Sequence, residues 1–362
     1  MKGATVRKWC YSGVAEALRP KVRYALAGLL VALLIPVAAG AKTTTNSARA
    51  ADSVTFLTDF GLYGGNAGPL YVGIQRGIFQ KYGINLNVVS GVGSTDTAQK
   101  IGAGTAQFGY VDGVAGVLAK SNGANIEYIG AYLQSHVGGL CYVKSRHPIA
   151  SYKDAEGIHI GATAGDAYMV FLPYLMKTNH ADPNYHYDTL AAANLGSALL
   201  GGQVDAISCG AITLPSRIAA AQAVGEQVGF FPYGKHGLNA LGLMLAVNGD
   251  LASSNPGLVL RFEKAYAASL QWSRAHPQEV AQDFPTAQTA QSPDTVEMSW
   301  QLTEPFQLAK KKSLLLSMPT QKMKSTVGLT IGGYKLNQTR KSLYAMFNYS
   351  FVKKLPASLR KP

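Results

Sequence analysis

Alternation between short β-branched runs and amphipathic stretches, over residues 54–112, is the feature that most constrains how this chain folds. Val54–Leu57 is an apolar strand candidate, Ile84–Val88 alternates apolar and polar residues, and Phe108–Asp112 is a third apolar run. Each gap between these runs holds a stretch with helical periodicity. Such strand–helix–strand alternation predicts a parallel sheet with right-handed crossovers.

Local signals mark the two helices between these strands. Leu70, Ile74 and Ile78 recur every four residues, so one face of the first helix is expected to be buried. Pro69 fits its first turn, where no proline N–H is needed, and Gly83 fits a left-handed residue at its end. The N-cap of the second helix is expected among three consecutive residues, Ser94, Thr95 and Asp96.

The motifs of this unit resemble the nitrate/sulfonate/pyrimidine branch of the periplasmic substrate-binding proteins. They are PLYVGIQRGIFQKYGINLNVV (69–89), GVGS (91–94) and AGTAQFGYVD (103–112). In that branch a helix ending in "kGyFkkeGl" leads to an extended strand, a Gly/Ser turn and "a.G.aDfg". Two later segments are also similar to the family, LLGGQVDAISCG (199–210) and NPGLVLRFEKAYAASLQWSRAHPQEVAQDF (255–284), so the resemblance covers roughly residues 53–300.

The resemblance implies an α/β fold of the periplasmic binding protein-like type II, with two doubly wound α/β lobes joined by a two-stranded hinge. Closure of such a hinge around a ligand is a standard route to binding. The expected divisions are a signal peptide and short linker at 1–51, the first lobe at 52–140, the second lobe at 141–237, a return to the first lobe with C-terminal helices at 238–310, and a basic tail at 311–362 that packs on the first lobe or is partly disordered.

The function implied is the extracytoplasmic solute-binding component of an ABC importer, which delivers its ligand to permease and ATPase subunits. A monomer without enzymatic activity, cofactor or metal is expected. Two alternatives stay open. One is a thiamine-pyrimidine synthase-like enzyme, which shares the fold; the yeast-type enzymes carry a CCCFC stretch that this chain lacks. The other is a ligand sensor that docks on a membrane receptor.

Polar and aromatic residues follow the predicted strands, at the edge where open α/β sheets bind ligands. The candidates from the first lobe are Asp59, Phe60, Tyr63, Asn66, Ser94, Thr95, Tyr110 and Asp112, with Gln134 and His136 near the first crossing between the lobes. The competing interpretation of the carboxylates and hydroxyls is plain helix capping. In the second lobe, His159–Thr163 and the helix through Met176 repeat this design, and the candidates are Thr163, Asp166, Tyr168 and Ser208.

The residue types at these positions constrain the ligand. The aromatic candidates suit a flat heterocycle or another small organic molecule. The carboxylates Asp59, Asp112 and Asp166 argue against a bare anion, since no Arg or Lys lies in the loops assigned to the cleft. The prediction is therefore an amine- or hydroxyl-bearing ligand, a thiamine-precursor pyrimidine first and an alkanesulfonate or nitrate second.

The N-terminus predicts export. Six basic residues precede an apolar stretch at 24–40, and Ala39–Ala41 or Ala48–Ala50 fits a small-x-small cleavage site. We therefore expect a periplasmic protein with a signal peptide of about 1–41 or 1–50. An uncleaved N-terminal membrane anchor is the alternative.

Charge is unevenly distributed behind the net value of +13. Residues 52–304 hold 13 Lys and Arg against 19 Asp and Glu, whereas residues 305–362 hold 12 Lys and Arg and no acid. The lobes are therefore mildly acidic, and they lack the mixture of basic and aromatic residues that a nucleic-acid-binding surface needs. We interpret the basic tail as a solvent-exposed end of the chain, and binding of the tail to an anionic membrane surface is the alternative.

Neither the cysteines nor the histidines form a catalytic or metal-binding motif. Cys10 lies in the predicted signal region, and Cys141 and Cys209 are either a disulfide, which export would permit, or buried free thiols. The chain contains no GxxxxGK[ST] or GxSxG motif, and its seven histidines lack the i,i+4 spacing of a zinc site.

Overall fold

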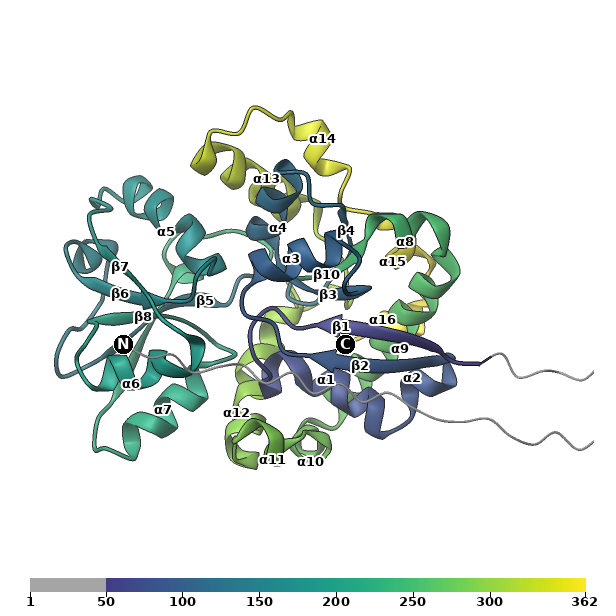
Figure 1. The fold of residues 1–362 in the computed structure, drawn as a ribbon, viewed down its shortest axis with the longest axis horizontal. Helices are drawn as coiled ribbons and strands as arrows, with labels where there is room; N and C mark the ends of the chain where they lie inside the picture. Colours follow the sequence, from purple (N-terminus) through teal and green to yellow (C-terminus); the bar gives the residue numbers. More distant parts are fainter. Residues whose placement is uncertain (1–49) are drawn as a thin grey trace, which may run out of the picture. The chain divides into compact units, whose positions relative to one another are not determined.

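The structure is a computed structural model and describes residues 50–362. The predicted signal peptide, together with Cys10, lies outside the described residues except for its last two positions. Within residues 50–362, no helix combines the length and apolar character that a bilayer span requires. The described residues form two separate five-stranded sheets, each flanked by helices (Figure 1).

The first sheet has the strand order β2-β1-β3-β10-β4. Strand β1 pairs in parallel with β2 and β3, whereas β10 runs antiparallel between β3 and β4. The strands are β1 (Asp52–Leu57), β2 (Ile84–Val89), β3 (Phe108–Asp112), β4 (Ile126–Ala131) and β10 (Leu243–Asn248). The three strands predicted within residues 54–112 and their parallel pairing are confirmed.

The core of this lobe forms where its helices pack on the sheet. Phe262 stacks on Phe108 with ring centroids 3.9 Å apart. The ring of Phe56 is also stacked with Phe262, with centroids 5.9 Å apart. All three rings are fully buried. The helices before and after the sheet strands are α1 (Gly64–Gln75), α2 (Ile78–Lys81), α3 (Ser94–Gly102), α4 (Gly113–Ser121), α8 (Gly249–Ser254) and α9 (Pro256–Ala275).

Helix α1 begins earlier than the sequence predicts. It starts at Gly64, so Pro69 lies inside the helix and not in its first turn. A proline there removes one backbone donor and leaves the carbonyl of Gly65 without its helical partner. The hydroxyl of Tyr132 donates to that carbonyl, and the hydroxyl of Ser269 donates to the carbonyl of Pro69. These hydrogen bonds come from residues far away in the sequence, so no local pattern predicts them. They allow the helix to begin before Pro69.

The second sheet has the strand order β7-β6-β8-β5-β9. Strand β6 pairs in parallel with β7 and β8, and β5 runs antiparallel between β8 and β9. The strands are β5 (Gly138–Val143), β6 (His159–Ala162), β7 (His186–Thr189), β8 (Ala206–Gly210) and β9 (Val228–Pro232). The accompanying helices are η1 (Tyr152–Ala155), α5 (Ala167–Thr178), η2 (Ala192–Asn194), α6 (Leu195–Leu200), α7 (Leu214–Gln222) and η3 (Tyr233–Lys235).

A disulfide joins Cys141 of β5 to Cys209 of β8, at a sequence separation of 68. Both cysteines are buried, and their strands are direct neighbours in the second sheet. Of the two states that the sequence left open, the structure therefore has the disulfide. The disulfide links β8 to β5 at the end of β8, just before the loop that leads into α7.

The chain crosses between the sheets twice, at residues 132–137 and again at 233–242. The two crossings are hydrogen-bonded to each other. The amide of Gly242 donates to the carbonyl of Leu133 (3.0 Å), and the amide of Leu133 donates to that of Leu243 (2.9 Å). Two α/β lobes joined by a double connection are the fold class that the resemblance implies, and that prediction is confirmed.

The C-terminal part consists of helices joined by loops, and its end differs from what the sequence pattern predicts. A single last helix through Leu343, Phe347 and Phe351 is expected from their spacing, whereas the structure has two short helices with Phe347 between them. Residues 346–348 pair instead with β4: the amide of Tyr128 donates to the carbonyl of Met346 (2.7 Å). The elements here are η4 (Pro277–Glu279), α10 (Val280–Asp283), α11 (Thr286–Thr289), α12 (Pro293–Thr303), η5 (Glu304–Gln307), α13 (Thr320–Tyr334), α14 (Arg340–Tyr344), α15 (Tyr349–Lys354) and α16 (Ala357–Arg360).

Candidate functional site

A cavity lies between the two lobes, where the loops after β1 and β8 and the N-termini of α3 and α5 come together. The volume of the cavity is about 40 Å³ in this structure. Six of the residues named from sequence line it: Asp59, Phe60 and Ser94 from the first lobe, and Asp166, Tyr168 and Ser208 from the second. Aromatic and polar groups line it together, as they do in sites that bind small organic molecules.

The other candidates lie outside this lining and have structural contacts instead. Asn66 and Tyr63 shape the loop before α1, Tyr110 is buried in the core against Tyr266, and the side chain of Gln134 bonds the backbone of Ala309 and Leu314. The candidates outside the lining are Tyr63, Asn66, Thr95, Tyr110, Asp112, Gln134, His136 and Thr163.

Asp59 is positioned by the amide side chain of Asn66. Nδ2 of Asn66 donates to Oδ1 of Asp59 (3.1 Å), and Oδ1 of Asn66 accepts from the amide of Tyr63 (2.9 Å). Burial raises the pKa of Asp59 to about 7; the bond from Asn66 opposes this, and the charge of Asp112 adds to it. A cationic group that enters the cavity would therefore favour loss of the proton from the carboxyl group of Asp59.

The ring of Phe60 forms part of the cavity wall and is backed by a second ring. Tyr63 lies parallel to it, with centroids 6.5 Å apart. Phe60 also pairs through its backbone with Val92. The backbone pairing fixes the position of Phe60, and its ring offers a flat surface to a planar ligand.

The start of α3 corrects the predicted N-cap. Gly93 is the N-cap, and Ser94, Thr95 and Asp96 are the first three residues of the helix. Gly93 has a φ of 153° and lies against the second lobe, where an added Cβ would be 3.4 Å from the carbonyl oxygen of Gly165. Oγ of Ser94 accepts from the amide of Asp112 (3.0 Å) and thereby joins α3 to the end of β3.

The lobes touch beside the cavity. Oγ1 of Thr95 donates to the carbonyl oxygen of Gly165 across the gap, at 3.1 Å. Thr95 therefore contacts the opposite lobe directly, although it does not line the cavity. A hydrogen bond of this kind is available only while the lobes are close together, so it belongs to the closed arrangement.

On the second lobe, Asp166 caps α5. Its Oδ1 accepts from the amide of Tyr168 (2.8 Å). Surrounding protein raises the pKa of Asp166 to about 6, while hydrogen bonds from Tyr168 and Ser208 oppose the shift. Asp166 keeps part of its surface accessible, so it combines a capping role with exposure to the cavity.

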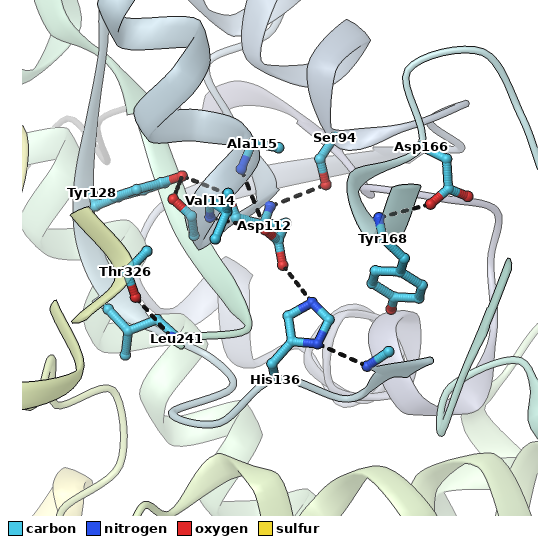
Figure 2. A network of polar contacts seen from close by, with 12 residues as sticks. Ser94, Asp112, Val114, Ala115, Tyr128, His136, Asp166, Tyr168, Leu241 and Thr326 are labelled. Carbon is cyan, nitrogen blue, oxygen red and sulfur yellow. Dashed lines mark hydrogen bonds and ion pairs between the residues drawn. The ribbon is translucent and has the colours of Figure 1, made fainter. Parts of the chain in front are cut away.

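Asp112 and His136 form a buried pair next to the cavity (Figure 2). Oδ1 of Asp112 accepts from the amides of Val114 and Ala115, which makes it the N-cap of α4. Its Oδ2 lies 3.2 Å from Nε2 of His136, whose Nδ1 accepts from the amide of Gly138 (3.0 Å). The pair connects the end of β3 to the first crossing between the lobes.

Six lining residues were not named from sequence, and Arg217 is the most important. They are Gly93, Ala167, Cys209, Ile212, Thr213 and Arg217. The loops assigned to the cleft hold no Arg or Lys, but Arg217 reaches the cavity from α7, the helix that follows β8. The prediction against an anionic ligand, which considered only the loops, therefore fails. The available signal was the position of Arg217: the start of a helix after a cleft strand faces the binding edge.

The site has no arrangement suited to a metal ion. No group of three or more His, Cys, Asp or Glu side chains in residues 50–362 has the geometry to hold one. What the cavity does offer is two carboxylates, one guanidinium and two aromatic rings that converge from separate lobes. This set can bind and enclose a small polar molecule.

Residues 65–280, more than half of the chain, match the family described as NMT1/THI5 like. The chain belongs to the NMT1/THI5-like family. The resemblance to the nitrate/sulfonate/pyrimidine branch of the binding proteins is thereby confirmed, and both lobes and the hinge lie within or beside the matched region.

Solved structures with the same fold include binding proteins. The alkanesulfonate-binding protein SsuA from Xanthomonas axonopodis pv. citri, bound to MOPS, superposes with a TM-score of 0.63 at 13% identity, over 80% of this chain and 96% of that chain. The periplasmic nitrate-binding protein NrtA from Synechocystis PCC 6803 gives a TM-score of 0.64 at 10% identity, over 86% and 91% of the two chains. At these identities the likeness shows the fold alone.

Curated relatives in sequence are named as enzymes, which corrects one prediction. The 4-amino-5-hydroxymethyl-2-methylpyrimidine phosphate synthase of Candida albicans (strain WO-1) is 23% identical over 242 residues, 61% of this chain and 68% of that protein. The enzyme of the same name from Aspergillus parasiticus is 23% identical over 155 residues, 43% of this chain and 45% of that protein. The prediction that this chain is not an enzyme is therefore contradicted by the names of these relatives.

Proposed function

We propose that this NMT1/THI5-like protein captures a small organic molecule between its lobes and delivers it to the permease and ATPase subunits of an ABC importer. The observation that carries the proposal is the cavity itself, because its walls come from both lobes and from the loops at the strand ends. Binding there favours the closed arrangement, in which Thr95 reaches Gly165.

The ligand proposed first is a pyrimidine of the thiamine-precursor type, followed by a sulfonate or nitrate. The aromatic rings of Phe60 and Tyr168 and the carboxylates of Asp59 and Asp166 suit a flat, amine-bearing ring. The names of the sequence relatives, which contain an aminopyrimidine, also favour that class.

Export to the periplasm is part of the proposal. The disulfide between Cys141 and Cys209 supports it, because such bonds persist in oxidising compartments. The basic, apolar N-terminal sequence supports it as well.

A thermal-shift screen of the full chain against aminopyrimidines, sulfonates, nitrate, amino acids and flavins tests the proposal. We expect one class to raise the melting temperature, and calorimetry to give one site per chain that is weakened at least tenfold in Asp59→Asn. Asp250→Asn, which removes an exposed carboxylate at the start of α8, is the matched control and should bind normally. Saturable binding that Asp59→Asn and Tyr168→Ala both leave unchanged would place the ligand elsewhere and refute the assignment.

A second candidate function is synthesis of a pyrimidine phosphate, which the names of the sequence relatives favour. Incubating the full chain with the substrates of such a synthase, and detecting the pyrimidine product by mass spectrometry, separates the two. Product formation that depends on Asp59 would favour synthesis, whereas tight binding without turnover would favour capture.

A further inference from the structure

We infer that the ligand of the inter-lobe cavity carries two opposite groups, a basic nitrogen received by Asp59 and Asp166 and an anionic group received by Arg217. The inference rests on the proposed function, since it assumes that the cavity binds a small molecule. It narrows the ligand to ampholytes, such as an aminoheterocycle or amine that also bears a carboxylate, sulfonate or phosphate.

Arg217 supplies the anion-binding end. It lines the cavity from α7, and its Nε is buried without a hydrogen-bond partner among the described residues. Burial lowers the pKa of Arg217. A planar guanidinium with an unpaired donor at a cavity wall is suited to receive a carboxylate, sulfonate or phosphate.

Asp59 and Asp166 supply the opposite end. Among residues 50–362, neither carboxylate forms an ion pair with a Lys, Arg or His within 4.0 Å. The negative charge of a third acid, Asp112, raises the pKa of both carboxyl groups and so disfavours their ionisation. A cationic nitrogen in the cavity would compensate the negative charge of Asp59 and Asp166, with which no described basic side chain forms an ion pair.

The two ends remain separate. Arg217 forms no ion pair with Asp59 or Asp166, although all three line one cavity. If a carboxylate and the guanidinium formed an ion pair with each other, neither group would be available to pair with the ligand. Because they form no such pair, a bare anion would leave the carboxylates uncompensated, and a plain amine would leave Arg217 unpaired.

Two aromatic rings in the cavity wall favour a planar body for the ligand. Phe60 comes from the first lobe and is backed by Tyr63 at 6.5 Å, whereas Tyr168 comes from the second lobe. A flat ring that joins the basic and anionic groups would lie against both walls when the lobes are closed.

Calorimetry with three matched probes tests the inference on the full chain. The probes are para-(aminomethyl)benzoate, which carries both groups, benzylamine, which carries the nitrogen, and para-toluate, which carries the anion. The ampholyte should bind at least tenfold more tightly than either half. Arg217→Gln should reduce its affinity to that of benzylamine, and Arg217→Lys, which keeps the positive charge, should restore part of the difference.

Lys177→Gln is the control, because it removes an exposed positive charge from α5 without touching the cavity, and it should change nothing. If benzylamine or para-toluate binds as tightly as the ampholyte, the inference is overturned while the proposed function stands. If none of the three binds but a ligand from the screen does, that ligand is measured on Arg217→Gln, and an unchanged affinity also overturns the inference. If no compound binds at all, the proposed function fails together with it.

Discussion

Replacing Asp59 with asparagine tests whether the cavity holds a carboxylate that resists ionisation. Burial raises the pKa of Asp59 to about 7 in the folded protein, from an ordinary value of 3.8. Between these two values the folded state holds a proton that the unfolded state has lost, so the stability of the ligand-free wild type falls as the pH rises. Each pKa unit corresponds to about 1.4 kcal/mol, which gives an upper bound of about 4 kcal/mol at pH 7.

The asparagine variant lacks this penalty because its side chain does not titrate, and its amide oxygen can still accept from Asn66. We expect Asp59→Asn to be more stable than the wild type at about pH 7 and close to it at about pH 4. Urea unfolding of the ligand-free full chain at both pH values, followed by tryptophan fluorescence, measures the difference.

Asp250→Asn serves as the control, since the carboxylate of Asp250 is exposed and its removal should have the same small effect at both pH values. A stability difference between Asp59→Asn and the wild type that does not change with pH would refute the reasoning. The carboxyl group would then ionise as it does in water, and the burial of Asp59 would not hold in solution.

Three further variants test the contacts that stabilise the lobes and the loops around the cavity. Replacing Cys141 and Cys209 by serine should lower the free energy of unfolding by about 2–4 kcal/mol, measured against the oxidised wild type, because the bond closes a long loop. Tyr132→Phe removes the hydroxyl that donates to Gly65 and should cost about 1–3 kcal/mol in urea unfolding, unless water takes its place. Asn66→Ala frees Asp59 and the loop before α1, so calorimetry should show weaker ligand binding; unchanged affinity would show that the loop is held by other contacts.

Local patterns in the sequence were enough for the strands and for the type of fold. The β-branched runs at β1, β2 and β3, with helical spacing between them, permit only a parallel α/β arrangement. They also placed Asp59, Phe60 and Asp166 correctly in the loops after strands or at helix starts, because the ends of parallel strands meet at one edge. Asp112 lies at the same edge, yet its side chain turns to cap α4.

Tertiary contacts decided the rest, since they join residues that no local pattern relates. The start of α1 depends on a donor from Tyr132, and the break between α14 and α15 depends on pairing of residues 346–348 with β4. Whether the cavity contains a positive charge depends on which face of α7 turns towards the opposite lobe, and that packing brings Arg217 into its wall. The sequence by itself thus determined the sheets and the binding edge through periodicity, whereas the charge pattern within the cavity arose only when the two lobes came together.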